Sequence, residues 1–442
     1  MAKKQLTIEE KLQAALVPVE EQPYKVPENW CWVKLGTVIT ASKEKQDAFD
    51  SETKYVGLEH IEKDTGNISF ALADEVKSTK SVFKCGDILY GKLRPYLNKH
   101  GIVDFNGVCS TDILVFNAIK GDNRLYDFYF SLPHFIEYAV SNSKGINLPR
   151  VSEKVILEIP FPMPPQGEQS RIVARIESLF AKLDEAKEKI QEVLDGADLR
   201  RAAILHQAFT GKLTEKWRKE NSVDDESWKE KLFAVFCETQ YGYTESATND
   251  PIGPKFLRIT DIQDNQVEWN KVPYCKITND DFEKYRLSYG DIVVARTGAT
   301  TGKSFLIEDV TDAVFASYLI GIKIKEKSMV MPHFVYKFMQ SAFYWQQITD
   351  FKIGIAQPGV NAKKLKTLRI KIPQIEEQQE IVRLLDNLLS REQSTVTACE
   401  EALTTIDTLK KSILARAFRG ELGTNDPSEA GAQELLQEIL AS

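Results

Sequence analysis

The strongest constraint on the fold of this chain is an internal sequence repeat. Residues 145–213 align with residues 354–422 at an offset of 209 positions, and 20 of the 69 aligned pairs are identical. Further upstream, the string Gly-Asp-Ile at 86–88 recurs at 290–292, an offset of 204. A period this long is too large for a solenoid, whose units measure about 20–50 residues. The repeat therefore predicts a duplicated module, in which a globular domain is followed by one long helix.

Each copy ends in a long helical pattern. Within 166–210 and again within 375–422, apolar residues recur at steps of three and four, with charged residues between them. A helix of about 43 residues is ~65 Å long. Its apolar stripe then needs a partner of similar length, so we expect the two helices to pair as an antiparallel coiled coil. A helical hairpin inside each copy, turning at 195–196 in the first, is the alternative. The expected contact residues of the coiled coil are Ile172, Leu179, Leu194, Ile381, Leu388 and Leu403.

The globular parts are predicted to be α+β domains. Short β-branched and aromatic runs bounded by Gly, Asp and Ser predict strands, and longer runs predict one amphipathic helix at an equivalent place in each copy. The strands are 87–90, 111–116, 291–295 and 318–324, and the helices are 126–140 and 332–344. The expected domains are an N-terminal helical segment at 1–20, a globular domain at 21–165, a spacer helix at 166–210, a second globular domain at 211–374, a second spacer helix at 375–422 and a C-terminal tail at 423–442.

Several function classes find no support in the sequence. The longest apolar runs fall far short of the ~20 residues of a membrane span, and the N-terminus has no apolar signal region. Six cysteines occur without a Cys-x-x-Cys pair, and five histidines show no metal-ligand spacing. These features predict a cytoplasmic protein without metal. The net charge of −7 gives no global support to nucleic-acid binding, so that hypothesis depends on local charge.

The most enzyme-like string is Thr-Gly-Ala-Thr-Thr-Gly-Lys-Ser at 297–304. It resembles a phosphate-binding loop, but Thr297 occupies the position of the first required glycine. The residues that follow predict a strand, whereas a phosphate-binding loop is followed by a helix. We therefore reject an ATP-using enzyme built on Gly302, Lys303 and Ser304, and we expect neither a catalytic residue nor a cofactor on this chain.

Local charge is more informative than the total. Residues 77–99 carry six cations and the single acid Asp87, and residues 352–371 carry six cations and no acid. One basic segment in each globular part favours contacts with DNA phosphates, and the interspersed amides and hydroxyls suit base edges. The expected phosphate or guanine contacts are Lys92, Arg94, Lys99, Arg296, Lys303, Lys363 and Lys364. The expected base-edge contacts are Asn98, Asn147, Thr300, Thr301, Gln357 and Asn361.

Taken together, these strings resemble the specificity subunits of type I restriction–modification systems, along essentially the whole chain. Four sets of residues carry the resemblance. They are Trp-x-Trp-Val-x-Leu-Gly at 30–36, Gly-Asp-Ile-Leu-x-x-Lys-x-Arg at 86–94, Gly-Asp-Ile-Val-x-x-Arg-x-Gly at 290–298, and the paired Glu-Gln-x-x-Ile-Val and Ala-Phe-x-Gly-x-Leu strings of the two helices. The second copy departs from the pattern, since Trp228 is followed by Lys-Glu-Lys-Leu.

The resemblance implies a subunit without an active site that binds double-stranded DNA. In that family, two target-recognition domains each read one half of a split sequence, and the paired helices set the gap between the halves. The helices also dock two methyltransferase subunits, which bind S-adenosylmethionine and methylate adenine, and ATP-dependent restriction subunits complete the endonuclease. The alternative from another class is an interaction scaffold whose duplicated domains bind proteins and never contact DNA.

Overall fold

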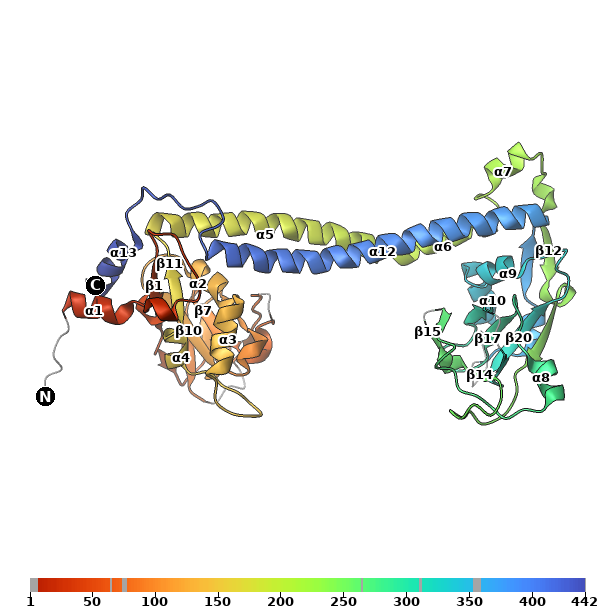
Figure 1. Cartoon of the computed structure of the whole chain (residues 1–442), viewed down its shortest axis with the longest axis horizontal. Helices are drawn as coiled ribbons and strands as arrows, with labels where there is room; N and C mark the ends of the chain where they lie inside the picture. The colour runs from red at the N-terminus through yellow and green to blue at the C-terminus, as the bar shows by residue number, and fades with distance from the viewer. Residues whose placement is uncertain are drawn as a thin grey trace. The chain divides into compact units, whose positions relative to one another are not determined.

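The structure is a computed structural model that describes residues 7–63, 66–73, 78–263, 265–309, 312–352 and 359–441. The chain divides into two compact units, and Figure 1 labels their elements. Unit 1 comprises residues 1–190 and 401–442, and unit 2 comprises residues 191–400. Each unit therefore contains one globular part and portions of both long helices.

Unit 1 is built around a four-stranded antiparallel sheet in the order β2-β10-β7-β8. A five-stranded sheet, β3-β6-β9-β4-β5, and a two-stranded pair, β1-β11, complete its strands. The strands predicted at 87–90 and 111–116 are confirmed as β7 and β10. The strand bounds are β1 Cys31–Lys34, β2 Ile39–Ala41, β3 Lys45–Gln46, β4 Lys54–Val56, β5 Ala71–Leu72, β6 Lys80–Phe83, β7 Ile88–Gly91, β8 His100–Ile102, β9 Gly107–Cys109, β10 Ile113–Ala118 and β11 Pro160–Met163.

Unit 2 repeats the central sheet in the order β13-β20-β17-β18, again antiparallel throughout. Three two-stranded pairs, β12-β21, β14-β19 and β15-β16, accompany it. The strands predicted at 291–295 and 318–324 are confirmed as β17 and β20. The strand bounds are β12 Lys229–Leu232, β13 Cys237–Tyr241, β14 Lys255–Leu257, β15 Ile262–Gln263, β16 Gln266–Val267, β17 Ile292–Ala295, β18 Ser304–Leu306, β19 Ala313–Phe315, β20 Leu319–Ile324 and β21 Arg369–Ile372.

The helix predicted at an equivalent place in each unit is in fact two helices. In unit 1, α2 (Asn123–Phe130) ends before Pro133, because proline starts α3 (Pro133–Ser141) and cannot continue the preceding helix. In unit 2, α9 (Pro332–Phe338) and α10 (Ala342–Lys352) are separated where the Ser341 hydroxyl donates to the Phe338 carbonyl oxygen at 2.7 Å. A serine bound to the backbone in this way competes with the helical hydrogen-bond pattern. The remaining short helices of the globular parts are α4 Glu153–Leu157, α7 Glu215–Glu220, α8 Asn279–Tyr285 and α11 Ala362–Lys366.

The first long helix has a local irregularity at one glycine. It consists of α5 (Gln166–Asp195) and α6 (Ala197–Phe209), with Gly196 between them. Gly196 has right-handed helical angles, its N–H donates to the Glu192 carbonyl oxygen, and its own carbonyl oxygen accepts from Arg200. Because the hydrogen-bond ladder crosses the glycine, the chain does not reverse there, which excludes the hairpin alternative. The second long helix, α12 (Ile375–Ala417), is continuous over 43 residues.

The two long helices pair antiparallel within each unit. In unit 1, Lys410 of α12 contacts Asp184 of α5 at 2.5 Å, and Leu414 and Ala417 share a core with Ile172 and Ile176. In unit 2, Arg200 contacts Glu392 at 2.7 Å. The core of unit 2 joins Leu205, Ala208 and Phe209 of α6 to Ile381, Val382 and Leu385 of α12. Of the predicted contact residues, Ile172 and Ile381 are fully buried, and Leu179, Leu194, Leu388 and Leu403 are half-buried.

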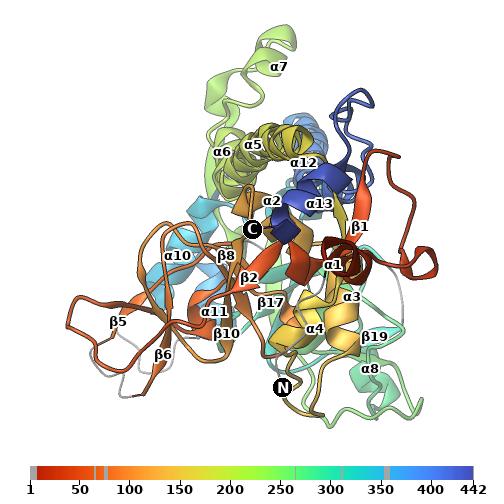
Figure 2. The same cartoon turned by 90° about the vertical axis from the view of Figure 1, so that its left-hand side faces the viewer.

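The segment predicted as a C-terminal tail contains a helix that belongs to the core of unit 1. Helix α13 (Ala432–Ala441) packs against helix α1 (Ile8–Ala15), as Figure 2 shows. Leu435 and Leu436 are buried in this contact, next to β1. Docking of an amphipathic helix onto an existing core is enough to order a chain end. The predicted N-terminal helical segment corresponds to α1 and the short turn after it, with residues 1–6 outside the described part.

Candidate nucleic-acid interface

The Gly-Asp-Ile strings build the turn that opens the central strand of each sheet. Gly86 and Gly290 adopt φ values of 93° and 86°, which strongly favour glycine. The following carboxylates bind their own turn, since Asp87 accepts from the Lys84 N–H at 2.8 Å and Asp291 from the Ser288 N–H at 3.0 Å. Burial raises the pKa of both carboxyl groups. These aspartates therefore have a structural role, and strands β7 and β17 emerge from equivalent turns.

The connections that leave these strands are also equivalent. Residues 92–99 join β7 to β8, and residues 296–303 join β17 to β18. Both connections need a left-handed backbone at two places four residues apart. Unit 2 uses glycine at both, Gly298 (φ 81°) and Gly302 (φ 94°), whereas unit 1 uses Arg94 (φ 53°) and Asn98 (φ 43°).

A second loop packs against each connection. In unit 1, the Val151 N–H donates to the Lys92 carbonyl oxygen at 3.1 Å, and the Arg94 N–H donates to the Pro149 carbonyl oxygen at 2.7 Å. In unit 2, the Val360 N–H donates to the Arg296 carbonyl oxygen at 2.9 Å. The basic segment expected from the sequence thus supplies the connection in unit 1 and the second loop in unit 2, at the equivalent end of the central sheet of each unit.

Arg94 is the most exposed of the cations expected in unit 1. It has no ion-pair partner within the described part of the chain. Lys92, two residues before it, is half-buried. Asn147 lies on the exposed tip of the loop that two 2.8 Å backbone bonds between Lys144 and Arg150 close. Lys92, Arg94 and Asn147 are therefore brought together by backbone contacts between their loops.

Asn98 and Lys99 point into the fold. Asn98 is 4% exposed, and the Lys99 ammonium donates to the Leu58 carbonyl oxygen at 2.6 Å. In unit 2, Thr301 is likewise buried, and its hydroxyl donates to the Gly298 carbonyl oxygen at 2.7 Å. Asn98 and Thr301 are buried and the Lys99 ammonium is bound to the backbone, so these side chains offer DNA little surface, which argues against the contacts expected of them.

Unit 2 presents a different set of side chains at the equivalent place. The Arg296 guanidinium lies 4.8 Å from the centre of the Tyr241 ring, a cation–π contact that orients it. Thr300 is half-buried and Lys303 is exposed. Lys303 leads directly into strand β18, so the phosphate-loop-like string lacks the helix N-terminus that would bind a phosphate.

The loop of unit 2 that follows carries the last expected residues. Asn361 caps helix α11, because its side-chain oxygen accepts from the Lys364 N–H at 2.8 Å. The Lys364 ammonium donates to the Phe351 carbonyl oxygen at 2.6 Å, whereas Lys363 is exposed. Gln357 lies outside the described residues.

Sequence reasoning missed several exposed side chains at these loops. Tyr96 and Tyr318 are 49% and 65% exposed, and Tyr318 is tied to the connection through its carbonyl oxygen, which accepts from the Arg296 N–H. Ile146, beside Asn147, is 99% exposed. In a sequence, aromatic and β-branched residues usually indicate a strand or a buried core position. Only the Gly145-Ile146 repeat could therefore have identified the exposed tip of the loop between Lys144 and Arg150.

Two classes of site have no counterpart in the described residues. They contain no group of three or more His, Cys, Asp or Glu side chains arranged to hold a metal ion. Among the same residues, no helix is both long and apolar enough to cross a membrane.

Comparison with known proteins gives a consistent family. A profile described as "Type I restriction modification DNA specificity domain" matches residues 27–195 and 236–401. The specificity subunit of type I restriction enzyme EcoDI from Escherichia coli is 36% identical over 200 residues, 44% of this chain and 45% of that protein. The EcoKI specificity subunit from Escherichia coli strain K12 is 24% identical over 426 residues, 90% of each chain. The chain thus spans less than half of the first relative and most of the second.

Solved structures share the fold. The HsdS subunit from Thermoanaerobacter tengcongensis has a TM-score of 0.66 at 21% identity, over 91% of this chain and all of that one. A chain from a structure titled for complex assembly and conformational transition of the type I R-M system has a TM-score of 0.72 at 20% identity, over 90% of this chain. Because the profile matches most of the sequence, in both units, the chain belongs to the family of type I restriction–modification DNA specificity proteins.

Proposed function

We propose that the chain is the DNA-specificity subunit of a type I restriction–modification complex, in which each unit reads one half of a bipartite duplex target. The observation that carries the proposal is the pair of equivalent connections after β7 and β17. Both carry cations at the equivalent end of the central sheet of their unit, yet the side chains differ. Unit 1 has the exposed Arg94 beside the exposed Asn147, whereas unit 2 has the exposed Lys303 and the half-buried Arg296. Two connections with the same backbone position but different side chains are suited to two different DNA half-sites.

The physics of such a reader divides its contacts into two kinds. Exposed lysine and arginine neutralise phosphates and supply salt-sensitive affinity, whereas amides, hydroxyls and arginine forks read base edges. The exposed Lys303 and Lys363 fit the first kind, as does the half-buried Lys92. Arg94, Asn147, Arg296 and Thr300 fit the second kind.

The chemistry is proposed to reside on partner subunits. Two methyltransferase subunits, using S-adenosylmethionine to methylate adenine, would dock on the long helices, and ATP-dependent restriction subunits would complete the endonuclease. Exposed apolar side chains on these helices support docking there, since Leu199 is 75% exposed, Leu409 45% and Val193 36%. A docked subunit would cover these exposed apolar side chains, Leu409 in unit 1 and Val193 and Leu199 in unit 2.

Exchange of one recognition domain tests the proposal. Residues 21–165 are replaced by those of a relative, and the methylome of cells carrying the complex is sequenced. We expect one half of the methylated sequence to change and the other half to stay. A change in both halves contradicts the assignment of one half-site to each unit.

Salt dependence separates this function from the interaction scaffold. In mobility shifts with the methyltransferase present, the logarithm of the DNA affinity is expected to fall linearly with the logarithm of salt concentration, by about 0.9 per neutralised phosphate. A scaffold that never contacts DNA gives no shift at any salt concentration.

A further inference from the structure

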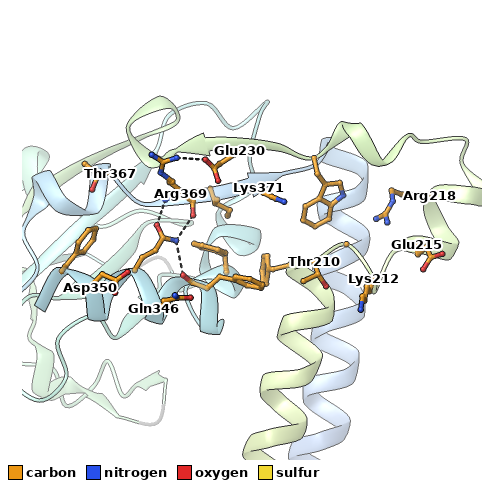
Figure 3. A pocket seen from close by; sticks show the side chains of 18 residues that line it. Thr210, Lys212, Glu215, Arg218, Glu230, Gln346, Asp350, Thr367, Arg369 and Lys371 are labelled. Carbon is orange, nitrogen blue, oxygen red and sulfur yellow. Dashed lines mark hydrogen bonds and ion pairs between the residues drawn. The ribbon is translucent and has the colours of Figure 1, made fainter. Parts of the chain in front are cut away.

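Unit 2 contains a groove lined in part by the end of the second basic segment, at Thr367, Arg369 and Lys371. It lies between helix α10, the strand pair β12–β21 and the end of α6, and it encloses about 910 Å³. Figure 3 shows its side chains. Its apolar wall consists of Phe209, Trp228, Phe338, Phe343, Phe351 and Ile370.

The rim of the groove is polar and carries both signs of charge. Glu230 and Arg369 form an ion pair at 2.9 Å on the β12–β21 side, and Gln347 of α10 holds the Arg369 backbone with bonds of 2.8 and 3.0 Å. Asp350 and Lys371 also line the groove, and neither has an ion-pair partner among the described residues. Both charges therefore remain available to a ligand.

The equivalent place in unit 1 is filled by Tyr24. Its ring packs edge-on against Trp32, with centroids 4.9 Å apart, and against His134, with centroids 5.8 Å apart. The Arg419 guanidinium lies 5.3 Å from the centre of the same ring. Burial raises the pKa of the Tyr24 hydroxyl well above its usual value. Tyr24 thus occupies an aromatic socket formed by three side chains from three different elements.

The duplication identifies the counterparts of these three side chains. Trp32 pairs with residue 162 across β1–β11. Residue 371 lies 209 positions after residue 162 and pairs with Glu230 across β12–β21, so Glu230 is the counterpart of Trp32. The same offset of 209 takes His134 of α3 to Phe343 of α10 and Arg419 to Thr210. All three counterparts, Thr210, Glu230 and Phe343, line the groove of unit 2.

Unit 2 supplies no tyrosine of its own to this socket. The segment that leads to Trp30 in unit 1 passes through Tyr24, whereas the segment that leads to Trp228 runs through α7 and the turn Asp225–Ser227. Of residues 215–227, only Glu215 and Arg218 line the groove. Within the described part of the chain, the socket that unit 1 fills is left open in unit 2.

We propose that this groove binds an extended peptide segment of a partner protein, in which an aromatic side chain enters beside Phe343. Residues 22–27 of the chain, Gln-Pro-Tyr-Lys-Val-Pro, are the template for such a ligand, since they fill the counterpart socket. Flanking prolines keep a segment extended and reduce the entropy lost on binding. Charged residues on either side of the aromatic one match the mixed rim.

A peptide titration tests the proposal. The ligand is a fluorescein-labelled peptide with the sequence of residues 20–28, Glu-Glu-Gln-Pro-Tyr-Lys-Val-Pro-Glu, and fluorescence anisotropy is measured on the full-length chain. We expect saturable binding that weakens about tenfold or more for the Phe343→Ala chain and for a peptide with Ala in place of Tyr. The Ile252→Ala chain, which loses an exposed apolar residue of unit 2 outside the groove, should bind as the parent does.

Three outcomes would overturn the proposal. The first is no saturable binding. The second is binding that Phe343→Ala leaves intact and Tyr24→Ala of the chain strengthens, which places the peptide in unit 1. The third is a concentration-dependent dimer that Phe343→Ala dissolves, which makes a second copy the occupant. DNA mobility shifts with the Phe343→Ala chain show that it is folded, and they test the proposed DNA function separately from the groove.

Discussion

The indole nitrogen of Trp30 donates a hydrogen bond of 2.7 Å to the carboxylate of Glu168, near the start of helix α5. Trp228 and Glu377 repeat the contact in unit 2 at 3.1 Å. Both glutamates are fully buried. The tryptophan stands at the entry to each globular part, so this bond fastens the start of the domain to the helix that follows it.

The two glutamates should nevertheless differ in how much their removal costs. Glu168 accepts from Trp30, Thr424 and Asn425, whereas Glu377 also forms a 2.6 Å ion pair with the buried Arg218. We expect Glu377→Ala to lower the free energy of unfolding by about 3–5 kcal/mol, because it leaves a buried charge uncompensated. For Glu168→Ala we expect about 2–3 kcal/mol, the cost of buried donors without an acceptor.

Urea unfolding of both variants measures the difference. Glu168→Gln and Glu377→Gln are the matched controls, since each keeps an acceptor of the same shape. The glutamine should cost more at 377 than at 168. Equal losses at the two positions would contradict a special role for the Arg218 pair.

Arg94 should separate stability from DNA binding. Its left-handed backbone strongly favours glycine, and the equivalent residue in unit 2 is Gly298. We expect Arg94→Gly to raise the free energy of unfolding by up to about 1 kcal/mol, because the strain of a non-glycine residue disappears. The same change should weaken DNA binding about tenfold, by removal of an exposed cation at the proposed interface.

Thermal unfolding and mobility shifts read the two effects independently. Arg175, an exposed arginine on helix α5, offers a control of equal charge. Arg94→Gln should weaken DNA binding, and Arg175→Gln should leave it unchanged. If both variants bind equally less well, Arg94 acts only through net charge.

Lys99 and Lys303 are at equivalent positions but should behave differently. The Lys99 ammonium is bound to the Leu58 carbonyl oxygen, and Lys303 is exposed. We expect Lys99→Met to cost about 1 kcal/mol of stability and to leave the salt dependence of DNA binding as it was. Lys303→Met should leave stability unchanged and reduce the salt slope by about 1. Mobility shifts across a salt series, with melting curves for each variant, distinguish this result from its reverse.

His134 predicts a loss of stability in mild acid. Burial, aided by the nearby Arg419, lowers its pKa to about 4 from the ordinary 6.5. The contribution of the neutral His134 imidazole to the free energy of unfolding is therefore complete above pH 6.5. It is lost as the pH falls toward 4, because only the unfolded chain takes up the proton over that range. The full difference amounts to about 3 kcal/mol.

The equivalent residue in unit 2, Phe343, suggests the control. His134→Phe should flatten the dependence of melting temperature on pH between 6.5 and 5, where few carboxyl groups titrate. A curve of unchanged slope would show that another group causes the acid sensitivity.

The duplication and the helix periodicity predicted most of the fold. Strands β7, β10, β17 and β20 and the long helix α12 follow from local patterns, because each buries a regular apolar face. The break between α2 and α3 was missed although Pro133 marks it. Helix α13 was missed because a short terminal helix is stabilised by a core that lies far away in the sequence.

The candidate site was harder to predict, because a sequence does not show whether a charged side chain faces solvent or the interior of the fold. The pattern placed Lys99 and Lys303 in the same class, although the fold turns the first inward. Left-handed positions such as Arg94 depend on hydrogen bonds to a distant loop, and exposure of Tyr318 depends on where its strand ends. Such features arise from tertiary contacts and have no local signature.

The division of the chain has a consequence for its synthesis. Unit 2 is one uninterrupted stretch, so it can fold as soon as residue 400 has left the ribosome. Unit 1 must wait, because the end of α12 and helix α13 complete its core. A truncation that removes helix α13 would therefore damage unit 1, whose first residues are made earliest, and spare unit 2.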